Sequence, residues 1–276
     1  MSRGAMSRGA MSTGIPRYVR PRPDRVGGLT STGWSILLVV AGVLTVEAAS
    51  RLGLISTVDL VPVTVMAGRA AELVTDPAFL TRQLLPTLGL IAAGFAAAAV
   101  LGVAVGLLLW RSPWWSDALQ PYLNIYYAIP TFAVYPILVV LFGTGPVPIL
   151  LLATAFSVVV IIANALIGFR SVPVAVDKLA RANRLGRRAH LTKILLPAAV
   201  PDIAAGLRLG LVYATIAVLA TEFILATRGL GHFISQAYHT FHTVDMYAGI
   251  LLICLVALVL NLGVGAVLSR LDWRQR

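Results

Sequence analysis

Charged side chains are scarce in this sequence of 276 residues: they make up 12% of it, whereas hydrophobic residues make up 58%. Ordinary soluble domains carry about 25% charged residues. Such an apolar chain cannot cover a water-exposed surface, so we expect an integral membrane protein. The net charge is +11, but the cations lie in tails and loops beside apolar stretches. This placement favours membrane topology over nucleic-acid binding.

Cysteine and nucleotide-binding motifs are also lacking. Cys254, inside an apolar run, is the single cysteine, which excludes a disulfide framework and a cysteine-based metal site within one chain. The pattern Gly-x4-Gly-Lys-Ser/Thr is absent, so we expect no P-loop for ATP phosphates in this chain. The first thirty residues hold six arginines and no apolar core of signal-peptide length, so we expect no cleaved signal.

Uncharged stretches between the charges predict an all-α membrane protein with about six transmembrane helices. We expect a cytoplasmic tail at 1–33, a first transmembrane helix at 34–51 and an extracytoplasmic loop at 52–82 with a short interfacial helix around Val65–Val74. A core at 83–269 and a cytoplasmic tail at 270–276 follow. The core spans are expected at 83–110, as two helices within 118–169 around the turn Gly143–Pro146, from near Pro201 through Glu222, and at 246–269.

The distribution of cations tests this topology. Seventeen Lys or Arg residues fall on the expected cytoplasmic side and four on the other, which supports an inside–inside orientation. Arg208 and Glu222 bracket only thirteen uncharged residues, about 20 Å of helix. This is short of the bilayer core, so we expect each charge near a helix end or facing a polar cavity.

Prolines and small residues interrupt the apolar spans. Glycines at 89, 94, 102 and 106 predict close helix–helix approach. Pro130 and Pro136 lie among tyrosines, and a kinked helix lining a path is as consistent with this as ordinary packing irregularity. An interhelical hydrogen bond suits Asn164 better than a ligand contact. The candidate translocation pathway comprises Tyr126, Tyr127, Pro130, Tyr135, Asn164 and Glu222.

The cytoplasmic loop at 170–197 holds the densest basic cluster. Six cations fall within sixteen positions, and Leu179, Ala182, Leu185 or Gly186, and Ala189 recur at steps of three and four. This spacing predicts a short amphipathic helix. We expect Leu196-Pro197 to stop it, because proline lacks an N–H and restricts the residue before it. From the pattern alone, a docking helix and a mere topology signal are equally consistent with these cations.

Ordered motifs over about residues 58–272 resemble the membrane subunit of bacterial binding-protein-dependent ABC importers, most closely the nitrate, sulfonate and taurine type. The motifs are PTLG (86–89), AIP (128–130), FGTG (142–145), NALIGFRSV (164–172), LPAAVPDIAAGLRLGL (196–211), TEF (221–223) and ATRGLGHFI (226–234). The resemblance implies a type I importer permease with both termini in the cytoplasm of a bacterium, in its inner membrane.

The family's cytoplasmic loop reads roughly Glu-Ala-Ala, three residues, Gly, nine residues, an apolar residue, one more, and Leu-Pro. Counted back from Leu196-Pro197 without gaps, this sequence has Lys178-Leu179-Ala180 and Arg184 at those positions. With a two-residue deletion it has Ala180-Arg181-Ala182 and Gly186. In both alignments the acidic residue is missing.

The resemblance also implies partners: two cytoplasmic ABC ATPase subunits that bind ATP and Mg, a second copy of the chain, an extracytoplasmic solute-binding protein and membrane lipid, with no cofactor on this chain. The solute would be a small anion such as an aliphatic sulfonate, taurine or nitrate. The residues implied to couple to the ATPase are Leu179, Ala180, Arg181, Ala182, Asn183, Arg184, Leu185, Gly186, His190 and Leu191.

Two rival functions were weighed against this interpretation. A secondary transporter driven by an ion gradient usually has ionisable residues near mid-membrane and often internal repeats. Here Glu47 and Glu222 are the candidates for proton carriage, and no repeat is evident. A metal-dependent membrane enzyme would use His232, His239 and His242, but only Asp245 lies beside them to complete a site. Interfacial histidines explain this group better.

Overall fold

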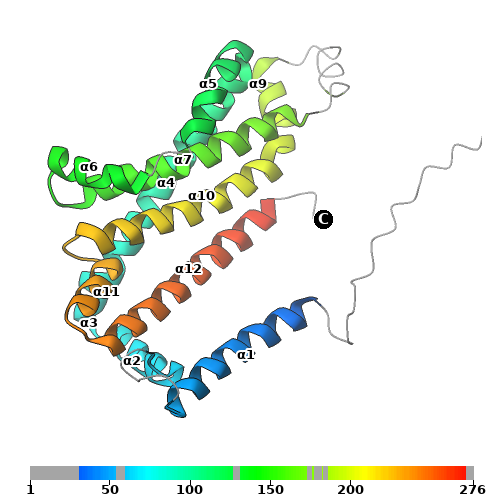
Figure 1. Ribbon diagram of the computed structural model, residues 1–276. Helices are drawn as coiled ribbons and strands as arrows, with labels where there is room; N and C mark the ends of the chain where they lie inside the picture. Colours follow the sequence, from blue (N-terminus) through cyan, green and yellow to red (C-terminus); the bar gives the residue numbers. More distant parts are fainter. Residues whose placement is uncertain are drawn as a thin grey trace, which may run out of the picture.

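The computed structural model describes residues 31–53, 60–126, 131–172, 176, 182 and 186–271, and the regular structure among them is helical. Five helical segments of this part of the chain are long and apolar enough to cross a membrane (Figure 1). They contain α1 (Ser31–Arg51), α4 (Leu85–Arg111), α7 (Pro146–Arg170), α10 (Leu196–Leu225) and α12 (Thr243–Leu271). The all-α membrane fold is thereby confirmed.

The first of the two spans expected within residues 118–169 is divided into shorter pieces. α5 (Pro113–Tyr126) is followed, after four residues outside the described part, by the 3-10 turn η2 (Thr131–Val134) and α6 (Tyr135–Phe142). α6 is apolar but shorter than a full span. The expected turn before α7 is confirmed: Gly143 ends α6 with φ 78°, a backbone conformation that suits glycine.

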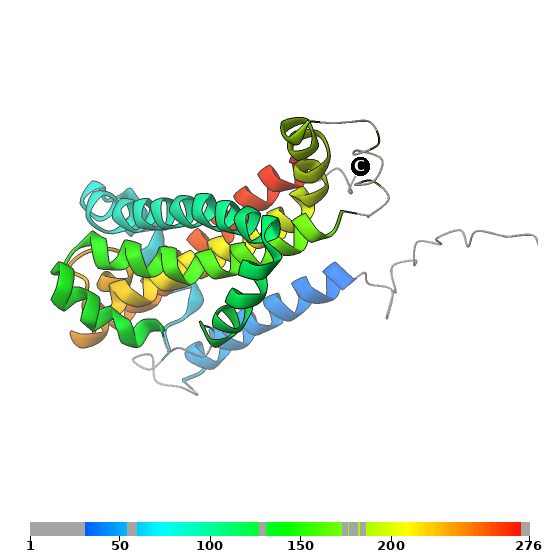
Figure 2. The ribbon, with the colours of Figure 1, turned by 90° about the horizontal axis from the view of Figure 1, so that it is seen from above.

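The core of the fold is α7, packed between α4 and α10; Figure 2 shows these three helices side by side. The α4–α7 interface uses the small residues expected from the sequence. A Cβ added to Gly106 would lie 2.7 Å from the Cβ of Ala165, and one on Gly102 would lie 2.7 Å from the Cβ of Ile161. Close approach of the backbones therefore depends on glycine here.

α4 and α10 are each preceded by a π turn of similar sequence. The π turn η1 (Leu80–Leu84) precedes α4, and the π turn η3 (Leu191–Leu195) precedes α10. Their sequences, continued by Leu-Pro, are LTRQLLP and LTKILLP. In each turn the threonine hydroxyl donates a hydrogen bond to the carbonyl four residues earlier, at 2.8 Å and 2.9 Å. The chain thus contains a short structural repeat that sequence reasoning missed.

The prediction that Leu196-Pro197 stops the basic helix is wrong. α9 (Arg187–His190), η3 and α10 follow one another without a gap. Proline does not fit the interior of an ordinary α-helix, because its ring clashes with the carbonyl four residues before it. The π turn removes this conflict by widening the helix: the N–H of Leu196 bonds to the carbonyl of Leu191, five residues back.

The two ends of the bundle differ in charge. α4 and α7 end in Arg111 and Arg170 beside the basic residues that precede η3, which marks the cytoplasmic end. The opposite end carries α2 (Val63–Thr75), where the interfacial helix was expected, α3 (Pro77–Phe79) and α11 (Leu230–His239). There Arg69 pairs with Glu72 at 2.8 Å and with Asp245 at 2.6 Å. Hydrogen bonds to these two carboxylates raise the pKa of Arg69.

α1 stands apart from the bundle in Figure 1, and most of its side chains are exposed. It is joined to α2 near its outer end. Glu47 accepts hydrogen bonds from the backbone N–H and the hydroxyl of Thr64, at 3.2 and 2.8 Å, and pairs with Arg51 at 2.6 Å. A helix with an exposed apolar surface of this kind is suited to lipid or to another membrane chain.

Candidate functional site

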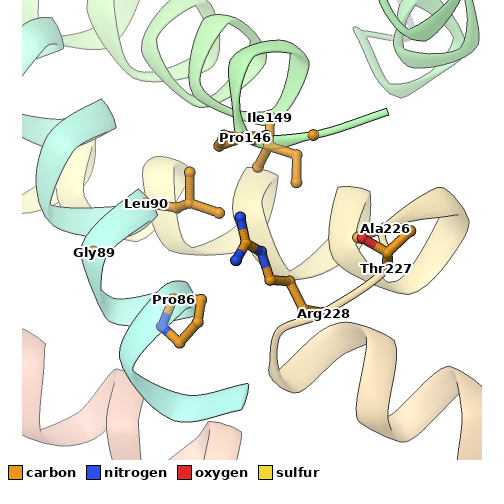
Figure 3. A pocket seen from close by; sticks show the side chains of 9 residues that line it. Pro86, Gly89, Leu90, Pro146, Ile149, Ala226, Thr227 and Arg228 are labelled. Atoms are coloured by element: carbon orange, nitrogen blue, oxygen red, sulfur yellow. The ribbon is translucent and has the colours of Figure 1, made fainter. Parts of the chain in front are cut away.

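The outer end of the bundle contains a cavity of about 340 Å³ built from three of the motif segments. PTLG supplies the first turn of α4, the FGTG segment leads into α7, and ATRG follows α10 (Figure 3). The lining consists mostly of aliphatic side chains, proline rings and the backbone of glycines. Its residues are Pro86, Gly89, Leu90, Gly145, Pro146, Ile149, Ala226, Thr227 and Arg228.

Among the described residues of this lining, Arg228 alone is charged. Its guanidinium group extends between Leu90 and Pro86 of α4 on one side and Pro146 and Ile149 of α7 on the other (Figure 3). Among the residues that the structure describes, no carboxylate lies within ion-pair distance of it. By contrast Arg51 and Arg69, at the same end, are both paired.

A buried polar cluster lies behind the cavity. Glu222 of α10 is 1% exposed, and its carboxylate oxygens lie 2.9 and 2.8 Å from the hydroxyl of Thr87 on α4. The backbone N–H of Gly231, in the first turn of α11, donates to the same carboxylate at 3.1 Å. Negative charge and hydrogen-bond acceptors are favourable at a helix N-terminus. The cluster therefore joins α4, α10 and α11.

The loop between α10 and α11 is held against α4 by two further hydrogen bonds. The N–H of Gly229 donates to the side-chain oxygen of Gln83 at 2.9 Å, and the N–H of Leu230 donates to Thr87 at 2.8 Å. Gly229 has φ 108°, and a Cβ there would overlap the carboxyl group of Glu222. Glycine is required at this position for both its conformation and its lack of a side chain.

Four of the candidate coupling residues are described, and they lie at the opposite end of the bundle. Leu191 packs against the buried cluster of Phe169 and Leu195. His190 and Leu191 also line a second cavity of about 420 Å³, with Trp110, Arg111 and Leu195. Ala182 and Gly186 are exposed. Leu179, Ala180, Arg181, Asn183, Arg184 and Leu185 lie outside the described residues.

The candidate pathway residues that the structure describes lie in different parts of the fold. Tyr135 is 1% exposed and belongs to the apolar core with Ile149. Asn164 donates to the carbonyl of Val160 in its own helix at 2.8 Å and faces Gly206 of α10. Tyr126 is half-buried at the end of α5. Tyr127 and Pro130 lie outside the described residues, so the pathway assignment stays a prediction.

Sequence reasoning missed three residues of the outer site: Gln83, Thr87 and Arg228. The sequence signal for two of them was present, because PTLG contains Thr87 and ATRG contains Arg228. Arg228 was counted only as one of four cations on the outer side. What the sequence could not indicate is that these motifs, about 140 residues apart, meet in space.

The family model of the "Binding-protein-dependent transport system inner membrane component" matches residues 98–276. The chain belongs to this family. The match includes α7, α10, α11 and α12, which are the elements that place Glu222 and Arg228. The chain is accordingly a multi-pass permease component of the inner membrane, as the ordered motifs predicted.

Named relatives agree with this membership. The nitrate import permease protein NrtB of Leptolyngbya laminosa is 30% identical over 68% of this chain and 67% of its own length. The taurine transport system permease protein TauC of Escherichia coli is 34% identical over 63% of this chain and 64% of its own length. A bicarbonate transport system permease protein, CmpB of Synechococcus elongatus, is 29% identical over 65% of each. The chain spans about two thirds of these relatives.

Solved structures show a similar fold. A chain of the MetNI methionine ABC transporter in an inward-facing conformation matches with a TM-score of 0.61 at 18% identity, covering 70% of this chain and 95% of that chain. A second crystal form of the same transporter gives a TM-score of 0.57. The fold of this chain is therefore that of an ABC importer permease.

Proposed function

We propose that this chain forms part of the solute pathway of an ATP-driven importer. In this proposal two copies of the chain enclose the pathway, two cytoplasmic ABC ATPase subunits bind ATP and Mg, and an extracytoplasmic binding protein delivers the solute. ATP-driven closure of the ATPase subunits moves the basic segment at 177–193. That movement switches the pathway between outward and inward access.

One observation carries the proposal: the helical stretch from Arg187 to Leu225 is unbroken. Its inner end adjoins the segment implied to dock on the ATPase. Its outer end bears Glu222 and leads into the loop that carries Arg228. α10 alone, with 30 residues, is about 45 Å long, enough to cross the bilayer core. A displacement of the docked end is thereby transmitted to the outer cavity by a stiff element.

The proposed solutes are small anions such as an aliphatic sulfonate, taurine or nitrate. Relatives are named for nitrate, taurine and bicarbonate transport, and these solutes share an anionic group. The unpaired Arg228 in the outer cavity supports an anion over a cation. The methionine transporter, at 18% identity, supports the fold and not the solute.

Co-purification tests the proposal. The tagged chain, expressed in a bacterium together with a candidate ABC ATPase subunit from the same source, is extracted in mild detergent, and the ATPase activity of the complex is measured. We expect a stoichiometric soluble ATPase whose activity rises with the binding protein. Leu185→Asp should abolish this stimulation, because a buried carboxylate disrupts apolar docking.

Leu52→Asp is the matched control, because Leu52 is 73% exposed at the outer end of α1. It should leave the ATPase stimulation unchanged. A correctly inserted Leu185→Asp protein that retains wild-type stimulation would refute docking through this segment. A stable chain that binds no ATPase would instead favour an ion-gradient-driven carrier, with Glu47 and Glu222 as the next residues to neutralise.

A further inference from the structure

The outer cavity combines three properties that are rarely found together on a structural surface. It is concave, with a volume of about 340 Å³, which lies in the range of small-molecule sites. Its walls are apolar, formed by Pro86, Leu90, Pro146 and Ile149. Its single charged group, the guanidinium of Arg228, extends into the space between these walls (Figure 3).

Among the described residues, no carboxylate pairs with Arg228. The buried carboxylate of Glu222 is occupied by the hydroxyl of Thr87 and by the N–H of Gly231. The other two carboxylates of the outer charge cluster, Glu72 and Asp245, are paired with Arg69. A guanidinium group in a partly apolar recess gains most from a bidentate oxyanion, to which it donates two parallel hydrogen bonds.

We infer that this cavity is a binding subsite for a small organic anion, with Arg228 holding a sulfonate or carboxylate group and the apolar walls holding its hydrocarbon part. An inorganic anion would satisfy Arg228 but leave the walls without contacts. The apolar surface of Leu90, Pro146 and Ile149 thus selects for a carbon skeleton. This inference rests on the proposed function only in that the ligand would be the solute or a close analogue.

Site-resolved chemical protection tests the inference without ATP or a binding protein. The full-length chain is placed in nanodiscs of phosphatidylcholine, so that no anionic headgroup competes for the arginine. Phenylglyoxal, which modifies guanidinium groups, is applied, and the modification rates of Arg228 and Arg82 are followed separately by peptide mass spectrometry. Arg82 is the internal control, because it is exposed at the same end and does not line the cavity.

Butanesulfonate should slow the modification of Arg228 in a saturable manner and leave Arg82 unaffected. Nitrate at equal ionic strength should require a concentration about tenfold higher, since it lacks the buried methylene groups. Butan-1-ol should not protect, because it lacks the charge. Equal protection by nitrate and butanesulfonate, or protection of Arg82 to the same degree, would overturn the inference, as would no protection by butanesulfonate.

A variant of the wall gives an independent measurement. In Leu90→Ala, at a half-buried position of the lining, the guanidinium is untouched but the apolar wall is reduced, so butanesulfonate protection should weaken while nitrate protection stays constant. If both change together, or neither changes, the wall does not contact the ligand and the inference fails. ATPase coupling is absent from these assays. A failure of the importer proposal would therefore leave the protection result standing, and the reverse also holds.

Discussion

Thr87 and Glu222 are 135 residues apart in the sequence, yet the hydroxyl of one lies 2.8 Å from a carboxylate oxygen of the other in a buried interface. Thr87 begins a span and Glu222 lies near the end of another. The contact fixes the outer ends of α4 and α10 against each other. The same hydroxyl accepts a hydrogen bond from Leu230, so the loop after α10 is held by the same pair.

Replacing Glu222 with alanine should destabilise the protein. The change leaves the N–H of Gly231 without its acceptor, and each such buried group costs about 1–3 kcal/mol. We expect a lower midpoint in a thermal aggregation assay in detergent. Phe223→Ala, at the exposed neighbouring position, should shift the midpoint much less. Equal midpoints for the two variants would show that the cluster does not stabilise the fold.

Replacing Gly229 with alanine should have a similar effect for a different reason. At φ 108° and ψ 165° an L-residue is strained by about 1–3 kcal/mol, because essentially only glycine adopts this conformation, and the new methyl group would overlap Glu222. Gly263→Ala is the control, since it has open space around it within α12. The same thermal assay measures both. A wild-type midpoint for Gly229→Ala would contradict the observed loop conformation.

The interface of α4 and α7 should not tolerate larger residues. Gly106→Ile would place its side chain where Ala165 lies, and overpacking of this kind costs about 1–3 kcal/mol or separates the helices. We expect a low yield of folded protein by size-exclusion chromatography in detergent. Gly42→Ile on exposed α1 should give the wild-type yield. A normal yield from Gly106→Ile would mean that the helices pack less closely than described.

The π turn before Pro197 should matter for coupling. Pro197→Ala removes the reason for the wide turn, and conversion to an ordinary α-helix would rotate the preceding basic segment by about 100° relative to α10. The ATPase of the assembled complex should then lose its stimulation by the binding protein. Pro86→Ala makes the same change in η1 at the outer end and should preserve ATPase binding. If the Pro197→Ala complex kept its stimulation while the Pro86→Ala complex lost ATPase binding, the π turn before Pro197 would have no part in coupling.

The sequence was sufficient for the class of fold, because apolar length and charge placement determine which segments cross a membrane. It also predicted the outer helix α2 and the close approach at Gly94, Gly102 and Gly106, but it was wrong for Gly89, which has open space around it. It misjudged Pro197, since a proline that follows a π turn continues a helix that it would otherwise end. Proline usually ends a helix because of its own ring and its missing N–H. Here the helix continues because the turn before Pro197 has π hydrogen bonding, which the sequence did not indicate.

The outer site could be predicted only in part. The motifs containing Thr87 and Arg228 were recognised, but partners that lie about 140 residues apart are set by the packing of α4 against α10. Glu222 was expected near a helix end or a polar cavity because a bare charge in the membrane is costly. Its actual partners are the hydroxyl of Thr87 and the backbone N–H of Gly231, which leave no charge pattern in a sequence.

The hydrogen bonds from Gly229 to Gln83 and from Leu230 to Thr87 join two walls of the outer cavity, α4 and the segment after α10, into one unit. The third wall, Gly145 to Ile149, belongs to the start of α7. These hydrogen bonds therefore oppose some changes in the width of the cavity mouth and not others. Widening it between the first two walls breaks both bonds, whereas displacing the Gly143–Pro146 turn breaks neither. A displacement of that turn therefore changes the aperture of the cavity without the loss of either hydrogen bond.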